Sequence, residues 1–124
     1  MESEYRQVTV GKFIFRVKIG YLYTEAGLWL AGQMVPGSTV MSRFPAIAFH
    51  AGADWAPTPN AEASQVVSYA RAHGARYFVL DQRETIAMRP QLAMLINLSD
   101  VPGLKRLHEI TEQGQKLVIF EVEP

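Results

Sequence analysis

The segment Ala72–Arg83, with the sequence AHGARYFVLDQR, places the strongest constraint on how this chain folds. Its apolar run Tyr77–Leu80 is typical of a strand that is covered on both faces of a sheet. Gly74 stands where a helix should stop, after a helical pattern of small and apolar residues. Asp81 follows the run directly, and ligands of α/β proteins gather at the carboxyl ends of such strands. The segment therefore predicts a helix end, a buried strand and a candidate site.

The composition is that of one folded domain, because 48% of the 124 residues are hydrophobic and 19% are charged. Twelve basic residues balance twelve acidic ones, so the net charge does not indicate nucleic-acid binding. The absence of cysteine excludes disulfides and thiolate chemistry. The longest apolar stretch, Phe44–Ala53, is far shorter than the roughly 20 residues of a membrane helix, and the opening MESEYRQ lacks signal-peptide character. We expect a soluble chain, which can still be a piece of a membrane protein.

Residues 1–20 form a segment that precedes a single α/β domain over residues 21–124. Within that segment, Lys12–Ile19 alternates apolar residues with basic ones, and a period of two predicts a half-buried strand. Basic residues mixed with aromatic ones also fit a segment that lies at a membrane surface. Both interpretations remain open at this point.

Helices and strands alternate along the rest of the chain, which predicts a three-layer, Rossmann-like α/β sandwich with a mixed sheet that ends in an antiparallel hairpin. Asn60 is expected to cap the helix before the central strand, without a capping box because Ala63 stands at the third position. The expected elements are, in order, a helix capped by Thr24 and ended at Pro36-Gly37, a strand over Ser38–Arg43, a short apolar segment over Ala46–Ala51, an extended piece at Trp55, a helix from Asn60 to about His73, the central strand, a loop over Gln82–Arg89, a helix from Pro90, and strands over Leu104–Ile110 and Lys116–Val122.

Polar residues follow two of the predicted strands and form the candidate site at the carboxyl edge. Ser42 and Arg43 stand at the exit of one strand, and Asp81 and Arg83 follow another. An arginine fork can hold a phosphate or carboxylate, and Asp81 can hold sugar hydroxyls. The alternative is a structural ion pair between Arg43 and Asp81, or capping of nearby backbone groups.

His50 is a further candidate, because it lies in the apolar segment FPAIAFHAGADW with Asp54 four residues later. Such a pair can belong to a metal or acid/base site. No second histidine stands at ligand spacing, so a hydrogen-bonded structural histidine is favoured and no metal is predicted. His73 and His108 are expected on the surface.

Four aromatic side chains are candidates for a stacking surface under a sugar ring, namely Trp29, Trp55, Tyr69 and Tyr77. Trp29 falls at helical core spacing. Trp55 stands beside the loop Pro57-Thr58-Pro59, so it is the better candidate for exposure.

The common catalytic and nucleotide-binding signatures are missing from the chain. Neither G-x-G-x-x-G nor G-x-x-x-x-G-K-[ST] occurs, and there is no G-x-S-x-G and no H-E-x-x-H. We therefore predict no cofactor and assign no catalytic residue. The ligand-binding candidates are Ser42, Arg43, His50, Trp55, Asp81 and Arg83.

The order of several short motifs resembles one known kind of domain. The motifs are AGLWL, VPGSTVMSRFPAIAFHAG, W-x-P-x-P, YARAHGARYFVLDQR and RPQL, followed by the terminal hairpin. Together they cover about residues 21–122. This pattern resembles the C-terminal soluble domain of bacterial integral-membrane glycosyltransferases that are similar to dolichyl-phosphate-mannose–protein mannosyltransferases.

The resemblance implies a non-catalytic role for this chain. In that family the catalytic acidic residues lie in extracytoplasmic loops between N-terminal membrane helices, so none of them can be assigned here. The implied partners are the membrane-embedded portion of the same protein, a polyprenyl-phosphate sugar, and a glycan or protein acceptor. The implied location is the extracytoplasmic, periplasmic face of the inner membrane.

Two other hypotheses do not depend on this resemblance. The alternative is a free-standing α/β module that binds a sugar-like or phosphorylated ligand. A hydrolase or transferase built on His50 with Asp54 or Asp81 is a third hypothesis.

Overall fold

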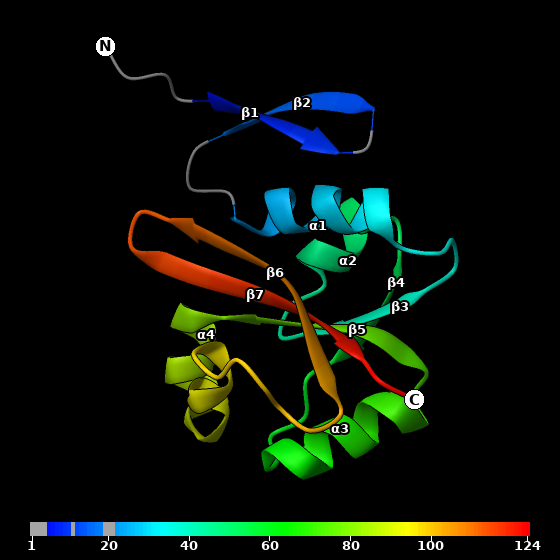
Figure 1. The fold of residues 1–124 in the computed structure, drawn as a ribbon, viewed down its shortest axis with the longest axis vertical. Coiled ribbons are helices and arrows are strands. Elements are labelled where there is room, and N and C mark those ends of the chain that lie inside the picture. The colour runs from blue at the N-terminus through cyan, green and yellow to red at the C-terminus, as the bar shows by residue number, and fades with distance from the viewer. Residues whose placement is uncertain (1–4, 11, 19–21) are drawn as a thin grey trace.

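A five-stranded mixed sheet forms the middle layer of the protein (Figure 1). The computed structural model describes residues 5–10, 12–18 and 22–124. The strands follow the order β4-β3-β5-β7-β6 across the sheet. Strands β3, β4 and β5 run parallel, whereas β7 is antiparallel to β5 and β6 is antiparallel to β7. The bounds are Thr39–Ser42 for β3, Asp54–Pro57 for β4, Ala75–Asp81 for β5, Leu104–Glu112 for β6 and Gln115–Val122 for β7.

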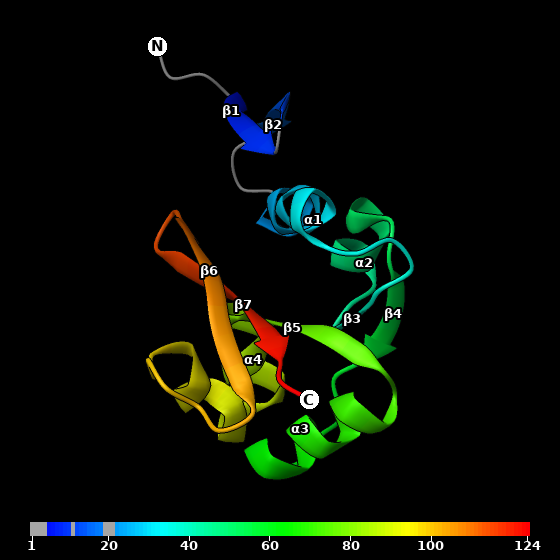
Figure 2. The ribbon, with the colours of Figure 1, turned by 45° about the vertical axis from the view of Figure 1, so that its right-hand side comes forward.

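Helices cover both faces of this sheet, which confirms the predicted three-layer, Rossmann-like α/β fold (Figures 1 and 2). Helices α1 and α2 pack on one face, in a cluster with apolar side chains of β5 and β7. Helix α3 and the 3-10 helix η1 pack in a second cluster on the other face, where α4 also lies. The bounds are Leu22–Gln33 for α1, Ala46–Ala51 for α2, Ala63–Ala72 for α3, Gln82–Met88 for α4 and Pro90–Ile96 for η1.

Strand β5 occupies the middle position of the sheet, as its apolar run predicts. The four residues of that run are at most 4% exposed. Phe78 and Leu80 pack in the α3 cluster, while Tyr77 and Val79 pack in the α1/α2 cluster. Burying a large apolar side chain contributes about 1.5–3 kcal/mol relative to leaving it exposed. The strand is therefore buried on both faces because every position of the run is apolar.

Helix α3 ends where predicted, but its N-cap lies two residues after the expected one. Gly74 follows the helix with a φ of 67°, the left-handed conformation that glycine adopts without a steric penalty. The prediction that Asn60 caps α3 without a capping box is wrong. Glu62 is the N-cap, and its backbone N–H donates to the Gln65 side chain at 3.2 Å, as in a capping box. The Asn60 side chain instead accepts a hydrogen bond from Gln91 at 2.8 Å.

The expected cap of α1 is also wrong. The helix already includes Leu22, so Thr24 lies inside its first turn. The Thr24 Oγ1 atom lies 3.3 Å from Nε2 of His50 on α2. A threonine of the capping type thus makes a contact between two helices that are distant in the sequence.

The predicted loop over Gln82–Arg89 is in fact mostly helix α4. Asp81 is its N-cap, because the Asp81 Oδ1 atom accepts a hydrogen bond from the backbone N–H of Glu84 at 2.7 Å. Thr85 is the buried residue of this helix. A short helix that buries so little has no apolar stripe, which is why periodicity did not reveal it.

The remaining predicted elements are confirmed. Helix α2 ends at Ala51, its C-cap Gly52 has a φ of 70°, and Trp55 lies in β4. The helix expected from Pro90 is the 3-10 helix η1, which buries three apolar residues. The closing hairpin turns at Gln113-Gly114, where both residues have positive φ. The buried residues of η1 are Leu92, Leu95 and Ile96.

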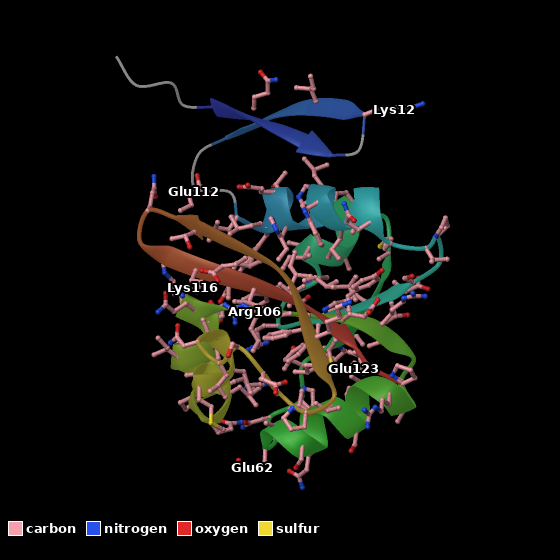
Figure 3. All side chains as sticks on the ribbon, viewed as in Figure 1. Lys12, Glu62, Arg106, Glu112, Lys116 and Glu123 are labelled. Carbon is pink, nitrogen blue, oxygen red and sulfur yellow. The ribbon has the colours of Figure 1, made fainter. Side chains whose placement is uncertain are left out.

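A second, two-stranded sheet is formed by β1, Tyr5–Val10, and β2, Phe13–Lys18. This hairpin lies beside α1, on the side away from the five-stranded sheet (Figures 1 and 2). The strand predicted over Lys12–Ile19 is present as β2, and Ile19 lies outside the described residues. Figure 3 shows Lys12 in the turn of the hairpin, pointing away from α1.

Trp29 packs at the edge of the α1/α2 cluster, where His108 of β6 stacks on it. The two ring centroids are 4.5 Å apart and the rings are nearly parallel, at 1°. Burial lowers the pKa of His108, and the neighbouring Glu109 partly opposes this effect. His108 is therefore a half-buried surface residue, because Trp29 of α1 covers one face of its ring.

Gly27 explains how closely α1 approaches α2. A Cβ atom at this position would lie 2.5 Å from the Cβ of His50 and 2.7 Å from the backbone oxygen of Ile47. In an isolated helix, glycine costs about 1 kcal/mol relative to alanine. Glycine is nevertheless required at this position, because any side chain would push α1 and α2 apart.

We expect Gly27→Ala to destabilise the protein although alanine is the better helix former. The added methyl group forces backbone shifts, so the free energy of unfolding should fall by about 1–3 kcal/mol. Chemical denaturation measures this change. The matched control is Gly32→Ala, the same substitution at an exposed position of α1, which should leave stability unchanged or raise it slightly. A Gly27→Ala protein as stable as the wild type would contradict the packing argument.

Candidate functional site

Strands β3 and β5 are neighbours whose chains leave the sheet toward opposite faces. The chain continues from β3 into α2 on one face and from β5 into α4 on the other (Figure 1). Ligands of α/β proteins bind at such a switch point, outside the carboxyl ends of the strands. The topology therefore indicates the same edge of the sheet as the sequence does.

A small cavity, here called the recess, lies at this edge. It joins Ser42, the last residue of β3, and Arg43, which follows it, to Asp81 at the end of β5. Thr58 and Arg89 also line it, and neither was predicted from the sequence. Its volume is about 20 Å³, which suits about one water molecule or one ligand oxygen.

A larger cavity, here called the pocket, shares two wall residues with the recess, Tyr23 and Glu84. Its volume is about 390 Å³, which lies in the range of small-molecule sites. Thr24, His50 and Arg83 line it as well. The recess and the pocket together thus contain five of the six predicted binding residues, and Trp55 is the sixth.

Asp81 is fully engaged by groups of the protein. Its side chain is buried, with the residue 6% exposed. The Tyr23 O–H donates to Oδ2, and the Glu84 backbone N–H donates to Oδ1 at 2.7 Å. Burial, followed by the hydrogen bond to Asp81, raises the pKa of Tyr23, so the phenol stays protonated as the donor. Asp81 therefore holds α1, β5 and α4 together rather than presenting a free carboxylate.

The alternative of an ion pair between Arg43 and Asp81 is wrong. Arg43 places its guanidinium over the ring of Phe44, 4.9 Å from the centroid. Arg89 donates to the backbone oxygens of Met88, at 2.7 Å, and Thr58, at 3.3 Å. Among the described residues, no carboxylate lies within ion-pair distance of either arginine.

His50 has the structural hydrogen bond that the sequence favours. Its Nε2 atom contacts Thr24 Oγ1, and its ring meets the edge of Phe49 at a centroid distance of 5.3 Å. Asp54 is exposed on β4 and does not line the pocket. Within the part of the chain that the structure describes, no three His, Cys, Asp or Glu side chains gather as a metal site requires.

The four candidate aromatic residues do not form one stacking surface. Trp55 is 42% exposed, and its Nε1 atom donates to the backbone oxygen of Ser42 at 3.1 Å. Trp55 therefore lies beside the recess without lining it. Tyr77 is buried in the sheet, and Tyr69 lies on the other face of the sheet, where its ring contacts His73 at a centroid distance of 4.0 Å and a tilt of 32°.

Signals for the two missed residues are weak but can be recognised afterwards. Thr58 follows β4, the third parallel strand, so it emerges at the same edge as the residues after β3 and β5. Arg89 follows α4 and directly precedes Pro90. Its position depended on a helix that the sequence did not reveal.

Comparison of the chain with protein-family models, curated proteins and solved structures finds no match. None of the helices in residues 22–124 combines the length and apolar character that crossing a membrane requires. The site is therefore interpreted from its own geometry.

We expect Asp81 and Tyr23 to be coupled energetically. Asp81→Ala removes an N-cap and leaves the Tyr23 hydroxyl unpaired, so the free energy of unfolding should fall by about 1–3 kcal/mol. Tyr23→Phe should cost about 1 kcal/mol, and the double variant should cost less than the sum. Glu84→Gln is the control, since the cap uses only its backbone N–H. Strictly additive values from denaturation would contradict the coupling.

Proposed function

We propose that this chain is a non-catalytic binding domain that holds a sugar-like or phosphorylated ligand at the carboxyl edge of its sheet. One observation carries the proposal: the recess and the pocket share the wall residues Tyr23 and Glu84. Both cavities lie at the switch point between β3 and β5. The walls of the combined site carry both positively and negatively charged side chains, and its volume suits one small molecule.

The residues of the site support binding rather than bond cleavage. Asp81 has donors on both of its oxygens, so it is poorly suited to act as a general acid or base. His50 is hydrogen-bonded to Thr24 and has no acidic partner among the described residues. A catalytic triad requires a base that a third group orients, and that group is not found in the described part of the site.

The chemistry of the lining matches a ligand with hydroxyls and an acidic group. Glu84 and Gln115 offer oxygen acceptors to sugar hydroxyls in the pocket. Arg83, which is exposed at the pocket, and Arg43 in the recess offer guanidinium donors to a phosphate or carboxylate. A sugar carrying an acidic group would use both kinds of partner.

The sequence resemblance extends this proposal to a context. The domain would be an extracytoplasmic, periplasmic accessory part of a membrane glycosyltransferase that uses a polyprenyl-phosphate sugar. There it would position donor or acceptor beside the membrane-embedded portion, and the basic and aromatic segment Lys12–Ile19 would lie nearest the membrane surface. The alternative is a free-standing module with the same binding edge.

The context is tested in the natural reading frame. An accessory domain predicts several membrane helices upstream in the same protein. It also predicts that Arg83→Ala in that protein raises KM with little change in kcat, because binding rather than chemistry is affected. A complete gene of this length alone, or a variant that loses kcat at unchanged KM, would contradict the accessory role.

The binding proposal is tested by titrating the chain with methyl mannoside and mannose 1-phosphate while following backbone amide signals by NMR. Shifts are expected at the residues of the pocket. Arg83→Ala should weaken binding of the phosphate by about three- to tenfold, because one charge-assisted contact is lost. Arg76→Ala, at the opposite end of β5, is the matched control. The absence of binding for both ligands would contradict the proposal.

A further inference from the structure

Three buried polar side-chain atoms in the described part of the chain have no hydrogen-bond partner, and their residues all line the recess. They are Nε of Arg43, Nε of Arg89 and Oγ1 of Thr58. Thr58 is only 4% exposed, so bulk water does not satisfy its hydroxyl. Buried polar groups in proteins are nearly always paired, and an unpaired set around one cavity indicates a missing partner.

We propose that the recess binds one oxygen of a singly charged oxyanion, a phosphodiester or a carboxylate, through Arg43, Thr58 and Arg89. This inference rests on the proposed function, because it names the acidic part of the ligand at the carboxyl edge. It also assigns a binding role to Thr58 and Arg89.

The unpaired atoms require an acceptor as their partner. Both Nε atoms carry an N–H group that can only donate, and the Thr58 hydroxyl can donate as well. The other nitrogens of Arg89 are held by the backbone oxygens of Met88 and Thr58, and Arg43 rests on Phe44. Both guanidinium groups are thus positioned before a ligand arrives, which lowers the entropic cost of binding.

The size of the recess decides how the oxyanion lies. A volume of about 20 Å³ accepts one oxygen atom but not a complete phosphate group. The rest of the acidic group would remain at the mouth, beside Tyr23 and Glu84. Because these two residues also line the pocket, the body of the ligand continues there.

The charge around the recess selects for a single negative charge. Two arginines line it, Arg43 and Arg89, and so do two carboxylates, Asp81 and Glu84. These charges balance, so a second negative charge on the ligand gains no further net attraction to offset its larger desolvation cost, whereas a singly charged group already gains two charge-assisted hydrogen bonds. An ordered water is the competing occupant, since it also fits the volume.

The experiment observes the arginine Nε–H signals by NMR at pH 8 and constant ionic strength. Dimethyl phosphate represents a phosphodiester, and acetate represents a carboxylate. At least one of these probes should shift the signals of Arg43 and Arg89 in a saturable manner, and the signal of Arg76 should not move. Methyl phosphate, which is doubly charged at this pH, should bind several-fold more weakly.

Two variants identify the partners. Thr58→Val keeps the shape but removes the hydroxyl, so binding of the better probe should weaken about fivefold. Arg43→Met removes a guanidinium from a partly exposed position, so it tests the recess even if Thr58→Val disturbs the fold. We expect this variant to weaken binding tenfold or more, and Arg76→Met is the control.

If neither dimethyl phosphate nor acetate shifts the two Nε–H signals, ordered water is the occupant and the inference is overturned. Tighter binding of methyl phosphate than of dimethyl phosphate would overturn the charge selection. These failures differ from failure of the proposed function. Methyl mannoside would then still shift the amides of the pocket in the wild type, whereas failure of the function abolishes that binding too.

Discussion

The buried carboxylate of Asp81 is the interaction on which the candidate site depends. The Tyr23 O–H and the Glu84 N–H both donate to it, so one side chain joins the start of α1, the end of β5 and the start of α4. This junction holds Tyr23 and Glu84 in the wall that the recess and the pocket share. The most conspicuous acidic residue of the sequence thus builds the site and is occupied in doing so.

At the carboxyl edge of the sheet, the residues that hold the structure together differ from those that remain available to bind a ligand. Hydrogen bonds within the protein engage Asp81 and His50, the residues on which the hydrolase or transferase hypothesis depends. The donors that remain unpaired belong to Arg43, Thr58 and Arg89. A site in which the Asp81 carboxylate is engaged and the guanidinium N–H groups are available is suited to hold an oxyanion rather than to transfer a proton.

Close packing of α1 on α2 determines the other wall of the site. Gly27 allows the helices to approach so closely that Thr24 on α1 meets His50 on α2. Both side chains line the pocket because of that approach. A glycine that weakens its own helix therefore contributes to the shape of the candidate ligand site, which links local propensity, packing and binding.

The sequence by itself determined the fold class and the edge of interest. Its apolar run at residues 77–80, the stop at Gly74 and the hairpin turn at Gln113-Gly114 are local patterns that tertiary contacts did not override. Only the tertiary structure decided the start of α3, the existence of α4 and the roles of Thr58 and Arg89. These features depend on contacts between residues far apart in the chain, such as Asn60 with Gln91 and Arg89 with Thr58, and no local periodicity encodes such contacts.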